Sequence, residues 1–170
     1  MRSLATLSLL STLTLGAPSD VTRSAPHAPA TRHELVAVYI GSIGIDSVSG
    51  MREIVPAMKV SLAGVATANG RAFVSKGVSI EPLVADGFRD LQWLGGFDEM
   101  SVGGNWTNTS VVQYLMRSPA GTRAIPQVIV LERDVTTSDR DITVTPEREV
   151  ARLVGVAGIA NWVKRGTPLP

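Results

Sequence analysis

The sequence predicts one α/β domain in which helices cover both faces of a central mixed β-sheet. Three observations indicate this class. Residues 34–40 form a nearly continuous run of aliphatic and aromatic side chains, typical of a strand that is buried on both faces. Residues 51–68 repeat apolar side chains at helical spacing, and residues 125–132 form a second apolar strand with a proline at its start. This alternation of strands and helices is the pattern of a sheet with helices packed on it.

The remaining segments predict an element order that is consistent with this class. Between the two strongest strands, the residue pattern predicts a strand at 72–78, a helix at 81–94 that opens with a proline, a short strand at 97–102 and a short helix capped by Asn108 or Thr109. After residue 132, a polar turn and a short strand at 142–144 are expected to pair back as a hairpin. Thr145-Pro146-Glu147 then reads as the start of the last helix, with its apolar stripe at Val150, Leu153, Val154, Ala157, Ala160 and Val163.

The composition excludes several classes of function. The chain has 170 residues, of which 44% are apolar and 18% charged, as in a globular domain. A net charge of +1 with scattered basic residues gives no support to nucleic-acid binding. The absence of cysteine excludes disulfides, thiolate metal sites and thiol catalysis. The two histidines, His27 and His33, both precede the predicted domain, so we expect no metal site and no cofactor.

The first 17 residues have the layout of a secretory signal peptide. Arg2 precedes an uncharged, leucine-rich stretch at residues 4–15, and small residues follow it. This stretch is shorter than the roughly 20 residues that a membrane-spanning helix needs. We therefore expect a signal peptide at 1–17, a disordered, proline-containing linker at 18–33 and the folded domain at 34–166. The implied location is the periplasm or the exterior, with no stable membrane span after cleavage.

In their order, these elements resemble the thioredoxin-like family. The segment Met51–Pro56 is similar to the family's first helix, in which a proline follows the second reactive thiol by five residues; this register places the two thiol positions at Val48 and Met51. Ile125-Pro126 resembles the strand opening at which the family carries a cis-proline facing the active loop. The insert at 81–124 is similar in size to those of periplasmic and secreted members. The resemblance implies a three-layer sandwich whose usual redox chemistry is missing.

The same resemblance implies a binding surface that needs no sulfur. In the family, the backbone before the cis-proline pairs with an extended peptide, which makes Ile125 and Pro126 candidates for binding. Ser47, Val48 and Met51 are the corresponding candidates at the helix start. Trp106 is a further candidate, because two glycines before it and asparagines around it form a distinctive, surface-like turn.

Two functions remain open on the sequence alone. The first is a binding or scaffolding module for an extended peptide or a partner protein. The second is a hydrolase with a serine or carboxylate site, which would require Ser42, Asp46 and a lysine to converge. We expect no catalytic residue, since the simpler prediction for Asp46, Ser47 and Ser49 is that they cap the following helix.

Overall fold

The computed structural model describes residues 28–117 and 122–170. Among these residues, six strands form one mixed sheet in the order β3-β2-β1-β4-β5, with β6 also paired to β4. Strands β1, β2 and β3 are parallel, and β4 runs antiparallel to β1, β5 and β6. The strands are β1 (Ala30–Gly41), β2 (Ala72–Ser79), β3 (Glu99–Ser101), β4 (Gln127–Thr137), β5 (Ile142–Val144) and β6 (Arg148–Val154).

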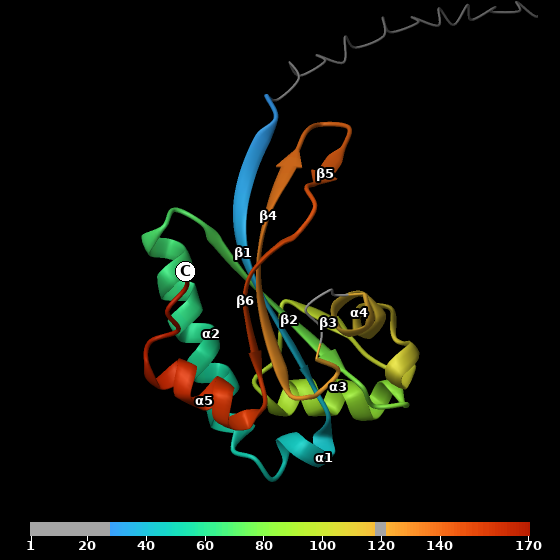
Figure 1. The fold of residues 1–170 in the computed structure, drawn as a ribbon. Helices are drawn as coiled ribbons and strands as arrows, with labels where there is room; N and C mark the ends of the chain where they lie inside the picture. Colours follow the sequence, from blue (N-terminus) through green and yellow to red (C-terminus); the bar gives the residue numbers. More distant parts are fainter. Residues whose placement is uncertain (1–27, 118–121) are drawn as a thin grey trace, which may run out of the picture.

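Helices pack on both faces of this sheet, as Figure 1 shows. They are α1 (Ile43–Asp46), α2 (Met51–Ala68), α3 (Val84–Trp93), α4 (Thr109–Val111) and α5 (Val156–Lys164), with a 3-10 turn at Asn105–Thr107 and a π-helical segment at Val112–Met116. Leu35, Ala37 and Tyr39 of β1 point into a core shared with α2 and α5. Alternate residues of the same strand, from Val36 to Ile40, point into a second core under α4 and the π-helical segment. The predicted three-layer, thioredoxin-like α/β architecture is therefore confirmed.

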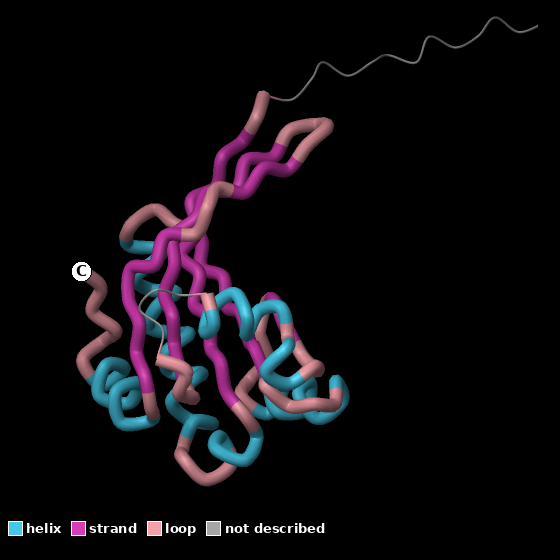
Figure 2. Tube along the Cα trace, turned by 45° about the vertical axis from the view of Figure 1, so that its right-hand side comes forward, coloured by secondary structure: helices cyan, strands magenta, loops and turns pink. Residues whose placement is uncertain are grey.

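One part of the sheet extends beyond the helical layers. In Figures 1 and 2 the first half of β1, the second half of β4 and β5 form a narrow projection. Ala30 pairs with Thr137, and Ile142–Val144 pairs back on Val135–Thr137, which confirms the predicted hairpin. We call this projection the arm (residues 30–33 and 134–144). Its side chains are largely exposed, because none of the helices in the described residues covers it.

Three sequence-based predictions about the elements need correction. The first strand begins at Ala30, because residues 30–33 pair with β4; these four residues belong to the sheet and not to a linker. Residues 148–154 form strand β6 and not the first half of a helix. The last helix begins only at Val156, after Gly155 adopts a left-handed backbone with a φ of 77°.

The predicted signal peptide at 1–17 and most of the predicted linker lie outside the described residues. Within residues 28–117 and 122–170, no helix is long and apolar enough to cross a bilayer.

Candidate functional site

The candidate site lies at the end of the sheet where β1 and β2 finish and β4 begins. Ser47 and Val48 lie in the turn between α1 and α2, and both are exposed. Met51 is the first residue of α2, with Pro56 inside the helix as predicted, but its side chain is fully buried in the core. Gly50 occupies the N-cap and offers no side-chain oxygen, so the prediction that Asp46, Ser47 or Ser49 caps this helix was wrong.

The Ile125–Pro126 pair is at the same end of the sheet as this turn. Gln127 pairs with Ile40, which places Pro126 beside Gly41, the residue from which the chain passes into α1. The Ile125–Pro126 peptide bond is cis, as the resemblance implies. Pro126 is buried, and its carbonyl accepts a hydrogen bond from the Gly155 amide at 2.8 Å. Among the described residues, no hydrogen bond joins this pair to Ser47, Val48 or Met51.

Trp106 lies in the 3-10 turn and is 38% exposed. The Gly104 amide donates to the Pro82 carbonyl at 3.3 Å, and Gly103 lies so close to Val84 that an added Cβ would meet the Val84 Cγ2 at 2.8 Å. The tryptophan therefore sits next to the start of α3. Asn108 caps the following helix as predicted, with its Oδ1 accepting from the Ser110 amide at 2.9 Å.

Beneath α1, three side chains form a buried acidic cluster that the sequence did not reveal. The Tyr39 hydroxyl donates to Asp46 Oδ1 at 2.5 Å, and both residues are fully buried. Asp90 of α3 is also fully buried, and its carboxyl group shares a side-chain hydrogen bond with the carboxyl group of Asp46. The prediction that Asp46 caps a helix was wrong, because this side chain turns inward to Tyr39.

Burial governs the protonation of this cluster. Burial and, to a smaller extent, the nearby charges of Asp46 and Glu81 together raise the pKa of Asp90 to about 7. Burial also raises the pKa of Asp46 to about 6, against the lowering effect of the hydrogen bond from Tyr39. The pKa of Tyr39 is raised well above its usual value, first by burial and then by Asp46. The two carboxyl groups thus favour a state with at least one proton at neutral pH.

The groups required for a serine hydrolase do not come together. The Ser42 hydroxyl donates to Glu81 Oε1 at 2.7 Å, and the same oxygen accepts from the Ile43 amide at 3.0 Å, an arrangement that anchors the first turn of α1. Lys59 donates to the Gly95 and Gly96 carbonyls, and Lys76 faces Glu99 at 3.7 Å. Ser42, Asp46 and the lysines therefore have separate partners. No group of three or more potential metal-binding side chains occurs within the described part of the chain.

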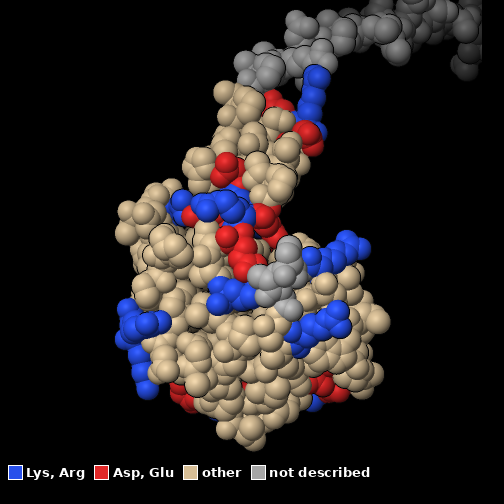
Figure 3. Space-filling view, in the orientation of Figure 1, with Lys and Arg blue, Asp and Glu red and all other residues tan. Residues whose placement is uncertain are grey.

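The outer surface of this end is unusually apolar. Ten large apolar side chains are exposed among the described residues, and seven of them lie on α1, the turn after it, α3 or the 3-10 turn. Of these elements, α1 contacts α3, and the glycines before the 3-10 turn approach Pro82 and Val84 at the start of α3. Arg52 of α2 lies over Trp93 of α3, 5.3 Å from the ring centre. Figure 3 shows the lower end of the molecule, where α1 and α3 lie in Figure 1, as mostly uncharged. We call this surface the apolar end; its side chains are Ile43, Val48, Leu83, Val84, Phe88, Trp93 and Trp106.

The sequence pattern pointed to only part of this surface. In the sequence, Val84, Phe88, Leu91 and Leu94 share one helical stripe, the pattern of a helix that buries one face. In the structure Leu91 and Leu94 are buried, whereas Val84 is 62% and Phe88 51% exposed. The helix turns Gly87 and Asp90 inward instead, and Gly87 approaches Ser79 and Val102. The apolar stripe of this helix is longer than the face that α3 buries. This difference was the sequence signal that could have indicated an exposed apolar surface.

The similarity of this chain to known proteins is low. No protein-family model and no curated protein sequence matches this chain. Among solved structures, the chain is similar to a thiol:disulfide interchange protein of the thioredoxin family from Chlorobium tepidum TLS. The two are 14% identical, the alignment covers 81% of each chain, and the TM-score is 0.36. The assignment of a thioredoxin-like fold therefore depends on the strand order and the helix placement described above.

Proposed function

We propose that the protein is a non-redox binding module that holds a partner protein or peptide at the apolar end. The observation that carries this proposal is the gathering of seven exposed apolar side chains on adjoining elements. Exposed patches of this kind on soluble domains mark interaction surfaces, because their contact with water is unfavourable until a partner covers them.

The chemistry of the chain supports contact and not electron transfer. Cysteine is missing from the entire sequence, so neither thiol position of a redox loop is filled. Val48 and Met51 occupy the corresponding region, and Val48 adds an exposed apolar side chain to the proposed surface. The turn that would present sulfur in a redox-active relative thus contributes to a docking surface in our proposal. We place this activity in the periplasm or outside the cell, on the basis of the signal-like residues 1–17.

Phe88 and Leu83 are the side chains through which we expect a partner to bind. Leu83 is the N-cap residue of α3 and Phe88 lies in the middle of the helix, and both side chains are more than half exposed. Loss of an interface residue that dominates binding costs about 2 kcal/mol or more, and about 1.4 kcal/mol is already a tenfold change in affinity.

The experiment selects twelve-residue peptides from a display library on the wild-type chain and then measures their affinity for variants. We expect Phe88→Ser and Leu83→Ser to weaken the selected peptides at least tenfold. Val60→Ser is the control, because Val60 of α2 is even more exposed than Leu83 and Phe88 but lies outside the apolar end. Equal affinities for the wild type and Phe88→Ser would reject the apolar end as the binding surface.

A further inference from the structure

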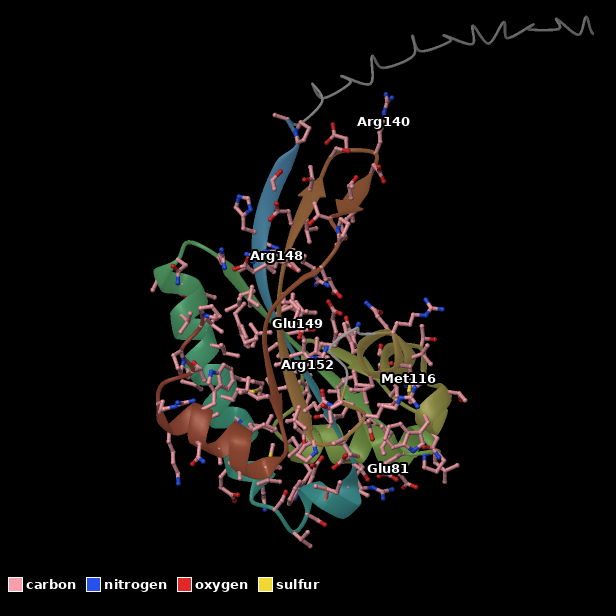
Figure 4. All side chains as sticks on the ribbon, viewed as in Figure 1. Glu81, Met116, Arg140, Arg148, Glu149 and Arg152 are labelled. Carbon is pink, nitrogen blue, oxygen red and sulfur yellow. The ribbon has the colours of Figure 1, made fainter. Side chains whose placement is uncertain are left out.

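The outer edge of β6 has no strand partner among the described residues. β6 pairs with β4 along Arg148–Val154, and the sheet continues from β4 only through β1 and β5. An unpaired edge presents backbone N–H and C=O groups that readily pair with a further strand. In Figure 4, Arg148, Glu149 and Arg152 follow one another along this strand.

Two cavities flank this edge on opposite faces of the sheet. The first, of about 510 Å³, has Leu35, Val65 and Val150 in its lining and opens on the α2 side. The second, of about 500 Å³, is lined by Tyr114 and Leu131 on the π-helical side. Glu149 lines both cavities. Both volumes lie in the range of small-ligand pockets, and each holds one or two side chains with ease.

This arrangement matches the geometry of an added strand. Successive side chains of an extended peptide point to opposite faces of a sheet. A peptide paired with β6 near Glu149 therefore directs one side chain into the first cavity and its neighbour into the second. The two cavities share Glu149 of β6, so they lie at the same position along this strand. Two consecutive residues of the peptide can therefore fill them, one on each face of the sheet.

The charges around the first cavity favour an acidic side chain. Arg71 and Arg148 both form ion pairs with the single carboxylate of Glu132. Glu149 is engaged by Arg152 through two hydrogen bonds of 2.9 and 2.6 Å. Two guanidinium groups thus share one carboxylate, and an incoming carboxylate matches the remaining positive charge.

The second cavity favours an apolar side chain. Leu131, Val144 and Pro146 contribute apolar walls. The carboxylate of Glu147 in its lining already accepts hydrogen bonds from the Tyr114 hydroxyl at 3.2 and 3.1 Å and from the Gln113 amide at 3.1 Å. Because the Tyr114 hydroxyl and the Gln113 amide already donate to Glu147, they do not need a polar ligand. The space that remains is therefore best filled by an aliphatic side chain.

We propose that the free edge of β6 accepts an extended peptide that carries an acidic side chain next to an apolar one. A second copy of this chain is a poorer occupant. Antiparallel pairing of β6 with itself would bring a second set of Arg148, Glu149 and Arg152 to cavities already lined by these charged side chains. This peptide site is separate from the apolar end.

The test uses the full chain and a fluorescein-labelled ten-residue peptide of alternating valine and threonine, with a central glutamate between two leucines. We expect binding by fluorescence anisotropy, at least tenfold weaker when the glutamate of the peptide is replaced by glutamine. Methylation of alternate backbone nitrogens on the peptide should abolish binding, because it blocks strand pairing. These peptide changes leave the protein untouched, so they report on recognition whatever a protein variant does to folding.

Protein variants and hydrogen exchange locate the site. We expect Arg148→Glu to weaken the glutamate peptide at least tenfold, whereas Arg140→Glu at the far end of the arm (Figure 4) changes its affinity less than twofold. Phe88→Ser should also change the affinity for the glutamate peptide less than twofold, a result that would distinguish this site from the apolar end. Peptide addition should slow amide exchange in residues 148–154.

Three results would overturn the proposal. They are equal binding of the glutamate and glutamine peptides, protection confined to α3, and a dimer whose β6 amides are already protected without peptide.

Discussion

Replacement of Asp90 by asparagine should destabilise the protein at acidic pH and stabilise it at alkaline pH. Asp90 is fully buried beside Asp46, with which it shares a hydrogen bond, and burial together with the charges of Asp46 and Glu81 raises its pKa from 3.8 to about 7. Between these two values the folded chain holds a proton that the unfolded chain has released. The stability of the wild type must therefore fall as pH rises from about 4 through 7.

The magnitude follows from the gap between the two pKa values. The difference of 7 and 3.8 is about 3 units, and each unit corresponds to about 1.4 kcal/mol, which gives an upper limit of about 4 kcal/mol for ionised Asp90 at pH 8. Asparagine avoids this cost but buries an amide, which costs roughly 1–3 kcal/mol. We expect Asp90→Asn to stabilise the protein by about 1–3 kcal/mol at pH 8 and to destabilise it by about 1–2 kcal/mol at pH 4.

The assay is urea unfolding at pH 4, 6 and 8, followed by the fluorescence of buried Trp162. Asp86→Asn is the matched control, because Asp86 lies on the same helix with an exposed side chain in an ion pair with Arg89. Its free energy of unfolding should stay within about 0.5 kcal/mol of the wild type at each pH. The reasoning fails if Asp90→Asn changes stability by the same amount at pH 4 and pH 8.

Two further predictions concern the polar core and the missing redox chemistry. Arg133→Met should destabilise the protein by about 3–5 kcal/mol in urea unfolding, because Glu99 loses its contact with Arg133 at 2.8 Å and the fully buried Glu34 loses its contact at 2.7 Å and keeps, among the described residues, only the exposed Arg32. The exposed control Arg89→Met should change stability by less than about 0.5 kcal/mol, and a loss below about 1 kcal/mol in Arg133→Met would contradict the role given to this ion pair. The pure protein should show no reduction of insulin above buffer with dithiothreitol, and any turnover would refute the exclusion of thiol chemistry.

Strong local patterns predicted most of the fold. The continuous apolar run in β1, the helical stripe around Pro56 and the proline before β4 each depend on neighbours in the sequence, and the structure has all three. The hairpin strand β5 was also predicted correctly. These features need only the periodicity of a strand or helix and the restricted backbone of proline.

The predicted last helix began too early in the sequence, because the apolar pattern of residues 150–154 fits either a helix or a strand. Val150, Leu153 and Val154 recur at helical spacing, yet they belong to a strand paired with β4 and followed by Gly155. The deciding contact is the ladder to β4, which is formed by residues about 20 positions away. Tertiary pairing of this kind overrides a local preference.

The candidate site was the least predictable part of the molecule. Val48 and Trp106 were named from the sequence, and both lie on the apolar end. Tyr39, Asp46 and Asp90 come together only because α1 and α3 meet over the end of the sheet. The exposure of Val84 and Phe88 likewise depends on which face of α3 turns toward Ser79, a property of the assembled layers that periodicity does not determine.

The most direct test of the central claim is hydroxyl-radical footprinting of the chain with and without a selected partner peptide. Our account predicts lower oxidation of Phe88, Trp93 and Trp106 in the complex, with Ile142 and Val144 of the arm unchanged. Protection of the arm alone, or no protection of these three aromatic side chains, would contradict the proposal that the protein acts through contact at its apolar end.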